Sequence, residues 1–594
     1  MLILNNFYII FYILGILNLS FFFSSCLFKR NLTVNIILIF LLLISFISIF
    51  FFILIFSGYL NFNYIGYFNL FIASLSILLL TYSKKIFLIF FREIRKKNLF
   101  IFVYFFLALY LISFLPVSDP DSLDYHLGIP KQWILDGGFI RNENWLHYRL
   151  ASYGEVINLF SIISFDGKLL GFLKVTILIF LIILSYKSFW QKDYLVKVFL
   201  TCPILLFFIF SQKPQFLGFL ISSIILLIIF ENSNKNQEKF FNFCIFFLAG
   251  FISALNYSFL PLTIIFLLIY VFYNKNFFLQ NKISLFLNFI LFISIVGLIY
   301  YKNFYYHDNF LTPFFENIFS IDPKTYNINF SEYLKNFGYK LNIENILKFP
   351  FRIFIPFNIK DITLLYGPLF IFIFFIKKFD NKAKILFIIF FLSVSIMMIT
   401  SQISNRYYFL SYFILLCLLS KCSFRNTQFL TKFSNFIFVI FTTFLSFYFF
   451  INAQSAFSEK KKNNFLYKNA YQFEEVLWLN KTINKDIFYT SDIRVKSLLN
   501  KNHITPHFLF YVKEENFSKE FFNFIDTNKI TLFSFVVDYN DNYLYTKLSY
   551  CKKILYEREF AEKQRNFLVQ KKIIKREIFV LDLTNQKCEL KKPL

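Results

Sequence analysis

Thirteen residues, Asp119 to Lys131, carry three carboxylates, one histidine and one lysine. They directly follow an apolar run, Leu99 to Val117, that is long enough to cross a bilayer. Ionisable groups held beside a membrane usually have a functional role. A carboxylate in this setting can act as a general base that deprotonates an acceptor hydroxyl, or it can bind a divalent cation.

The order of residues in this segment predicts a helix that lies at the membrane surface. Asp119 is a favourable N-cap and Pro120 is favoured at the first helical position. The run Asp136-Gly137-Gly138 is typical of a helix end. Pro130 would remove the hydrogen bond to the carbonyl of His126, so we expect a kink there.

We expect the three carboxylates to have different roles. Asp119 is expected to act as a cap, and Asp124 to be solvated or to face Lys131. Asp121 favours the helix dipole and is the residue that we expect to do the chemistry. His126 is expected to be a satisfied histidine at the interface and not a ligand.

The composition of the 594-residue chain is that of a polytopic membrane protein, because 57% of its residues are hydrophobic and only 16% are charged. The formal net charge of +26 does not indicate nucleic-acid binding, since no basic helix or aromatic-basic platform is present. Lys and Arg instead fill short loops between apolar runs, where they orient a membrane protein.

Apolar runs predict about fourteen transmembrane helices. They lie near residues 7–28, 33–57, 61–82, 98–117, 168–187, 195–212, 215–231, 240–257, 258–273, 283–301, 361–376, 385–401, 406–420 and 429–451. Basic loops, such as the one at 84–97, alternate with loops on the opposite face. Both long loops, 118–167 and 302–360, and the tail then lie outside the cytoplasm.

Three parts of the chain follow from this pattern. Residues 1–97 hold extra transmembrane helices and a basic cytoplasmic loop, 98–452 form a membrane core, and 453–594 form a small extracytoplasmic α/β domain. The expected domain has a helix at 473–479 and buried strands at 486–490, 531–537 and 577–581. Cys551 and Cys588 in this tail either form a disulfide or are two free thiols.

The pattern Asp-Ser-Leu-x-Tyr-His-Leu-x-x-Pro-Lys, from Asp121 to Lys131 and followed by Gly137-Gly138, resembles the glycosyltransferase C superfamily of polytopic transferases. It is similar to a bacterial branch related to protein O-mannosyltransferases and lipid A aminoarabinose transferases. Three looser matches lie in order on the same side of the membrane. They are Ser211–Pro214, His307–Phe315, in which Asp308 and Phe310 depart from the pattern, and Asn405–Tyr407.

The resemblance implies an enzyme of the bacterial inner membrane, with its active site and tail domain in the periplasm. It implies a sugar donor on a polyprenyl phosphate, an acceptor (lipid, glycan or protein) that the pattern leaves open, and transfer with inversion. Asp121 would be the base or hold the acceptor, and Asp119 is the alternative. Tyr125, His126, Lys131 and His307 are secondary candidates.

A lipid phosphate leaving group needs cationic stabilisation, which Arg406 and Lys213 at the outer ends of spans could provide. The alternative for both is an anchoring role, with the charged head reaching the interface. Arg149, Lys302, His307 and Arg352 are weaker candidates. No cofactor is predicted, although a divalent cation on Asp121 and Asp119 stays open.

Two other functions fit the same topology. An O-antigen polymerase or ligase also has many spans and a large outside loop, but it would rely on Arg and His in that loop. The loop at 302–360 has only His307 and Arg352 of these types. The third reading is a transporter, or an anchor that presents the tail domain, and the scarcity of charge within the spans weighs against transport.

Overall fold

The computed structural model describes most of the chain and divides it into two compact units. The described residues are 2–28, 31–94, 96–139, 145–189, 192–231, 238–312, 366–399, 405–484, 487–490, 493–500, 502–504, 521–527, 529–536, 552–562 and 572–581, together with the single residues 318 and 344. Unit 1 comprises Met1–Pro116, Ser152–Leu298 and Gly338–Lys462. Unit 2 comprises Val117–Ala151, Ile299–Phe337 and Asn463–Leu594. The expected loop 302–360 lies largely outside the described residues, as do Arg352, Cys551 and Cys588.

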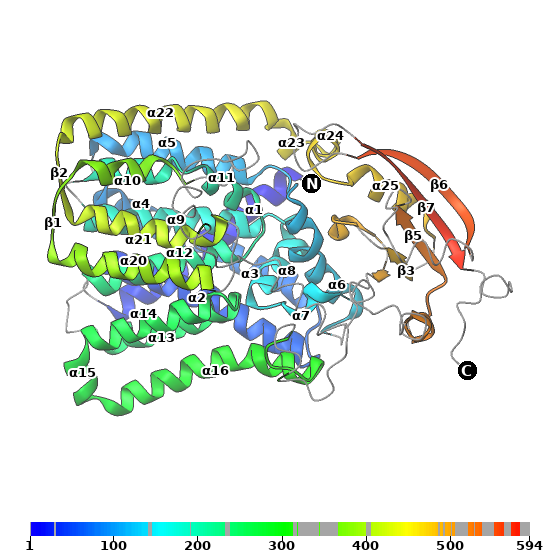
Figure 1. Ribbon diagram of the computed structural model, residues 1–594, viewed down its shortest axis with the longest axis horizontal. Helices are drawn as coiled ribbons and strands as arrows, with labels where there is room; N and C mark the ends of the chain where they lie inside the picture. The colour runs from blue at the N-terminus through cyan, green and yellow to red at the C-terminus, as the bar shows by residue number, and fades with distance from the viewer. Residues whose placement is uncertain are drawn as a thin grey trace. The chain divides into compact units, whose positions relative to one another are not determined.

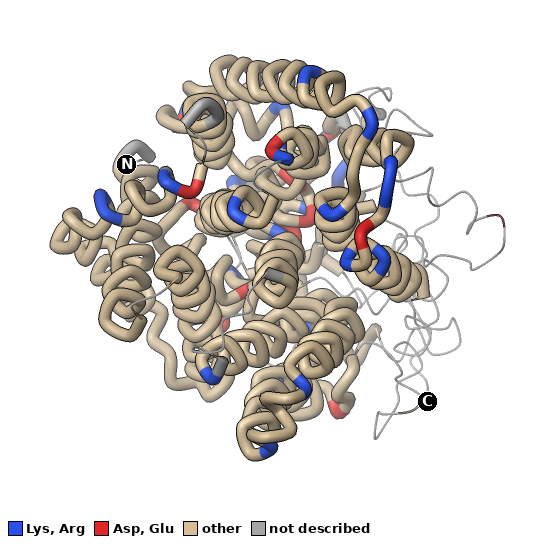
Figure 2. Tube along the Cα trace, turned by 90° about the vertical axis from the view of Figure 1, so that its left-hand side faces the viewer, with Lys and Arg blue, Asp and Glu red and all other residues tan. Residues whose placement is uncertain are grey.

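Unit 1 is built almost entirely of helices (Figure 1), and Figure 2 shows that uncharged residues make up most of each one. Its first half holds α1 (Leu2–Leu27), α2 (Leu32–Phe56), α3 (Asn63–Leu78), α4 (Leu80–Glu93), α5 (Lys96–Ser113), α8 (Tyr153–Ser164), α9 (Leu169–Ser188), α10 (Asp193–Leu200) and α11 (Pro203–Phe210). Then follow α12 (Gln215–Glu231), α13 (Glu238–Leu255), α14 (Phe259–Tyr273), α15 (Lys275–Gln280), α20 (Asn381–Ile399), α21 (Phe409–Ser420), α22 (Thr427–Asn452) and α23 (Gln454–Phe457). Helices α16 (Lys282–His307) and α24 (Glu459–Asn469) continue along the chain from unit 1 into unit 2.

Six of the described helices are long and apolar enough to cross a membrane, or eight if each bent pair is one span. The bent pairs are α3 with α4, at 75°, and α10 with α11, at 57°. Pro203 begins α11, where it cannot continue the hydrogen bonding of α10. Shorter apolar helices cover 99–113, 215–230, 239–255 and 259–273, so the structure supports fewer full-length spans than the sequence predicted.

Several expected boundaries differ from the structure. The predicted basic loop at 84–97 is mostly helical, because α4 runs through Lys84 and Lys85 to Glu93 as an amphipathic helix. The end of the expected loop 118–167 also folds as a helix, α8, which packs against α2, α3 and α9. Ser152 and Glu155 form a capping box that starts α8.

Buried polar groups hold the short turn between α11 and α12. The Lys174 ammonium donates to the carbonyls of Phe208 and Ser211, at 3.1 and 2.7 Å, where α11 ends. The Asn158 amide donates to the carbonyl of Gln212 at 3.0 Å. Because the last carbonyls of a helix have no partners within the helix, Lys174 satisfies groups that burial would otherwise leave costly.

Close packing of this turn against α8 gives the first prediction. A Cβ at Gly154 would lie 2.2 Å from Pro214 Cβ, a contact that only a shift of the turn can relieve. We expect Gly154→Ala to lower the free energy of unfolding by roughly 1–3 kcal/mol. Gly297→Ala is the matched control, since nothing lies within 4 Å of its added methyl group. Thermal unfolding of both variants in detergent measures the difference, and equal stability would contradict the prediction.

Unit 2 contains a five-stranded mixed sheet in the order β4-β3-β5-β7-β6. Figure 1 labels β3, β5, β7 and β6 of this sheet. Strands β4, β3 and β5 are parallel neighbours, whereas β7 pairs antiparallel with both β5 and β6. The strands are β3 (Ile487–Thr490), β4 (Asn502–Ile504), β5 (Leu532–Val536), β6 (Lys552–Glu562) and β7 (Lys572–Leu581). The other described elements are η1 (Ser122–His126), α6 (Gly128–Asp136), α7 (Leu146–Arg149), α25 (Phe473–Thr482) and η6 (Lys496–Leu498).

The sheet confirms the expected α/β character of the tail. The predicted strands match β3, β5 and β7, and the predicted helix matches α25. Aromatic side chains from Tyr489, Phe533, Phe535 and Phe579 form its core. Strands β4 and β6 were not predicted: β4 has only three residues, and β6 is an edge strand rich in charge, which does not give an apolar strand pattern.

Candidate functional site

The segment after α5 folds as the sequence predicted at both ends but not in the middle. Asp119 accepts hydrogen bonds from the Ser122 backbone N–H at 2.9 Å and from the Ser122 hydroxyl at 2.7 Å, so it caps the turn. Residues 122–126 form a π-helical turn, η1, that the Leu127 N–H closes on the Ser122 carbonyl at 2.9 Å. Helix α6 ends at Gly137, whose φ of 75° requires the left-handed region that glycine adopts without strain.

The π-helical turn replaces the single kinked helix that was expected. Pro130 cannot donate to the His126 carbonyl, and its ring would clash with that carbonyl in a continuous α-helix. The chain therefore widens at η1 and restarts as α6 at Gly128. Such wide turns often occur at functional sites. Its Ser122 and Asp124 side chains are buried, whereas Asp121 and Tyr125 at its edge are half-buried.

The structure corrects the expectation for Asp124. This carboxylate is neither solvated nor paired with Lys131, because it forms an ion pair with Lys496 in which both side chains are only 2% exposed. Arg494 lies on the other carboxylate oxygen, at 3.7 Å. The Lys496 ammonium also donates to the Ile493 carbonyl at 2.6 Å and lies 5.3 Å from the Trp145 ring centroid. Asp124 therefore joins the first polar loop to the C-terminal part of unit 2.

Lys131 binds the same C-terminal stretch through backbone groups. Its ammonium donates to the carbonyl of Ser497 at 2.8 Å and to the carbonyl of Leu499. Burial lowers the pKa of Lys131 from its ordinary value to about 8. These two contacts hold the Lys131 side chain against the C-terminal stretch, and its place among the secondary site candidates stays a prediction.

His147, which the sequence interpretation missed, lies near these charged groups. Its ring stacks on Tyr125, with centroids 4.3 Å apart and planes 8° apart. Burial lowers the pKa of His147 to about 4, and it is close enough to Asp124, Lys496, Arg494 and Asp121 for each to influence that pKa. Asp121 therefore belongs to the same electrostatic cluster as Asp124 and its two cations.

The low pKa of His147 predicts a stability change in mild acid. The unfolded chain takes up a proton near pH 6.5, but the folded chain does so only near pH 4, so stability falls as pH drops between these values. We expect His147→Phe, which keeps an aromatic ring against Tyr125, to reduce this loss by roughly 1–3 kcal/mol. Thermal unfolding of both proteins at pH 7, 5.5 and 4 measures it. Parallel curves for the two proteins would contradict the assignment.

The secondary candidates lie in several places of unit 2. His126 is buried, and its ring centroid is 4.2 Å from that of Tyr125. His307 is buried at the end of α16. The buried Lys302 ammonium donates to the carbonyls of Arg149 and Ala151, at 3.0 and 2.8 Å, which indicates a structural cation.

Arg149 is also buried, and it donates to the Thr312 hydroxyl at 3.3 Å. The Tyr306 hydroxyl donates to the Phe139 carbonyl at 3.0 Å. These contacts link the start of the second long loop to the first within unit 2. Arg149 and Lys302 thus hold the two loops together within unit 2.

The two cations predicted to bind phosphate, Lys213 and Arg406, belong to unit 1. Lys213 is only 1% exposed, and its ammonium lies 4.5 Å from the Phe207 ring centroid. This burial does not fit an anchor whose head reaches water. Arg406 is half-buried and lies 5.2 Å from the Tyr407 ring centroid, to whose hydroxyl it also donates at 3.4 Å. The approach of either cation to Asp121 stays a prediction.

No family model, no curated protein and no solved structure matches this chain. The functional interpretation therefore depends on the residues and their contacts.

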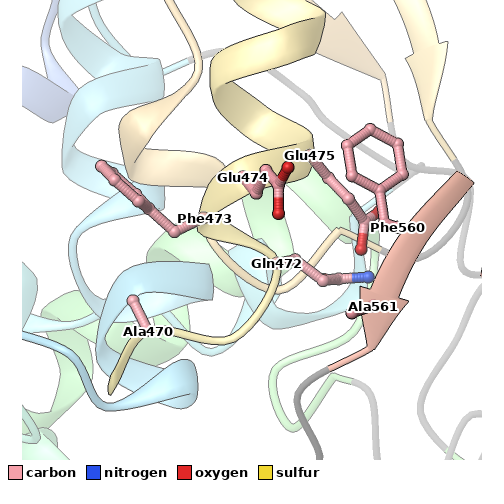
Figure 3. A pocket seen from close by; sticks show the side chains of 7 residues that line it. All are labelled: Ala470, Gln472, Phe473, Glu474, Glu475, Phe560 and Ala561. Carbon is pink, nitrogen blue, oxygen red and sulfur yellow. The ribbon is translucent and has the colours of Figure 1, made fainter. Parts of the chain in front are cut away.

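The described residues hold no group of three or more His, Cys, Asp or Glu side chains arranged to bind a metal ion. A pocket between α25 and β6 is lined by Gln472, Glu474, Glu475, Phe560 and neighbouring residues (Figure 3). Its cavity volume of about 10 Å³ holds a single water and not a sugar. The buried Glu475 there pairs with Arg576 at 2.7 Å, which is a structural contact of the tail domain.

Proposed function

We propose that this protein is a membrane glycosyltransferase that moves a sugar from a polyprenyl-phosphate donor to an acceptor on the extracytoplasmic face. The observation that supports the proposal is the arrangement of carboxylates on the η1 turn. Asp119 caps the turn and Asp124 pairs with Lys496. Asp121 lies between them, half-buried, in the cluster that surrounds His147.

The chemistry that fits this arrangement is a single inverting displacement. Asp121 removes the proton from the acceptor hydroxyl, and the acceptor oxygen attacks the anomeric carbon. The bond between that carbon and the phosphate oxygen breaks, and the phosphate leaves with the bonding electrons. Nearby cations stabilise the developing negative charge. One displacement inverts the anomeric centre without a covalent enzyme intermediate.

The membrane arrangement belongs to the same proposal. About fourteen apolar segments cross the bacterial inner membrane, with the shorter helices and bent pairs included among them. The Asp121 turn and the C-terminal domain then lie in the periplasm, as the distribution of basic loops predicts. Arg406 and Lys213 are proposed to contact the donor phosphate.

Reconstituted full-length protein tests the proposal. We expect polyprenyl phosphate to be released from a polyprenyl-phosphate sugar, with one sugar added per acceptor. Transfer of a preassembled oligosaccharide would instead favour an O-antigen polymerase or ligase. If no donor from a panel of polyprenyl-phosphate sugars binds, stabilises the protein or is consumed, the enzyme proposal fails and a transporter or anchor takes its place.

A further inference from the structure

The C-terminal stretch 493–499 supplies the cations of the Asp124 cluster. Lys496, in η6, is the close and buried partner of Asp124. Arg494 is the second cation, 3.7 Å from the same carboxylate, and its side chain is 45% exposed. Its backbone N–H is held by the Gln472 side-chain oxygen at 2.8 Å, so the residue itself is anchored. The η1 turn and this stretch belong to one unit, so the arrangement is internal to it.

Asp124 does not need the positive charge of Arg494 for its own neutralisation. One buried carboxylate is neutralised by one buried ammonium, and Lys496 already provides it. The Arg494 guanidinium approaches Asp124 only to 3.7 Å, which is beyond hydrogen-bond distance. Within the described ranges it donates no hydrogen bond, although a guanidinium carries five N–H donors. A half-exposed guanidinium whose N–H donors are not used by the described residues is suited to bind an oxyanion.

The chemical class of the anion follows from the fork geometry of arginine. Two parallel N–H groups match two oxygens of a phosphate, which makes Arg a preferred phosphate ligand. We propose that Arg494 binds the donor phosphate, so that the C-terminal domain completes the active site. This inference rests on the proposed function for the identity of the ligand as a lipid-linked phosphate. With Asp121 in the same cluster, the base and the leaving-group cation come from two distant parts of the sequence.

Binding of undecaprenyl phosphate to the full-length protein in detergent tests the inference. We expect Arg494→Gln to weaken the affinity by roughly tenfold or more, because a hydrogen bond to a charged group is lost. Arg494→Lys keeps the positive charge but loses the two parallel N–H donors. Its affinity for undecaprenyl phosphate should lie between those of the wild type and Arg494→Gln. Arg558→Gln is the matched control, because Arg558 is 48% exposed and pairs at 3.1 Å with Glu474. Its affinity for undecaprenyl phosphate should equal that of the wild type.

Competing ligands identify the source of the phosphate. Undecaprenol, which lacks the phosphate, should bind equally to wild type and Arg494→Gln. Inorganic phosphate that displaces undecaprenyl phosphate only weakly supports a lipid ligand. Displacement as strong as by the lipid itself supports the anion site but assigns it to free phosphate. Wild-type affinity in Arg494→Gln, or no phosphate binding by the wild type, would overturn the inference.

The outcomes separate this inference from the proposed function. Sugar transfer that persists in Arg494→Gln with unchanged donor affinity leaves the transferase intact and removes Arg494 from its site. Binding of undecaprenyl phosphate that depends on Arg494, in a protein that transfers no sugar, keeps the phosphate site and rejects the transferase. Thermal unfolding of each variant confirms that loss of binding is not loss of fold.

Discussion

Replacing Asp121 by Asn is expected to lower the rate of sugar transfer by roughly 10²–10⁴-fold, the usual contribution of a general base. Asn keeps the size and the acceptor oxygen of Asp121 but cannot take up the acceptor proton. Because Asp121 is half-buried at the edge of η1, the substitution should leave the fold and donor binding nearly unchanged. Single-turnover release of polyprenyl phosphate, with thermal unfolding in parallel, measures both effects.

Two carboxylates of the same segment provide controls for this experiment. Asp136→Asn changes an aspartate at the end of α6 that accepts from the Gln132 amide at 2.8 Å, and transfer should be unchanged. Asp119→Asn keeps one acceptor for the Ser122 cap, so we expect it to lower the stability by roughly 0.5–1 kcal/mol. Undiminished transfer by Asp121→Asn, with Asp119 intact, would reject Asp121 as the base. Loss of transfer in Asp119→Asn alone would move the role to Asp119.

The local features of this site could be predicted from the sequence, because their causes lie within a few residues. Asp119 caps through Ser122, three positions away, and the end of α6 depends on Gly137 alone. The partner of Asp124 could not be predicted, since Lys496 lies 372 residues further along the chain. Neither residue carries a local signal for the other.

The same contrast between local and long-range causes explains the other features that the sequence did not predict. His147 lies in the run Trp-Leu-His-Tyr-Arg, which has no recognisable motif, and only its stack on Tyr125 places it in the cluster. The π-helical turn was missed because spacing of i, i+4 assumes a continuous α-helix through Pro130. Aromatic strands of the tail were predicted correctly because burial on both faces leaves a continuous apolar run.

Hydropathy alone does not distinguish full-length spans from short or bent helices, for a related reason. Helix α21 has twelve residues, all of them buried within the protein, although its composition predicts a span. A helix that packs on all sides is as apolar as one that faces lipid. Length and bending distinguish α21 and the α10–α11 pair from uninterrupted helices such as α22, and neither property can be read from composition.

Replacing Lys496 by Met is expected to lower the free energy of unfolding by about 3–5 kcal/mol, because it leaves Asp124 buried without its close cation. Arg494 remains at 3.7 Å and should hold the loss toward the lower end of that range. Lys462→Met is the matched control. Lys462 pairs with Asp166 at 2.8 Å, but the two side chains are 18% and 26% exposed, so the loss should be below about 1 kcal/mol. Thermal unfolding in detergent compares the two.

The double variant Asp124→Asn, Lys496→Met separates the ion pair from simple packing. Once the carboxylate is neutral, the buried charge that makes Lys496→Met costly is gone, so the double variant should recover much of the lost stability. An additive loss would instead mean that the Lys496 side chain acts through packing against Trp145. If Lys496→Met costs no more than Lys462→Met, the pair does not hold the η1 turn. Asp121 would then have to be positioned by its other neighbours, of which the Tyr125–His147 stack is the first to test.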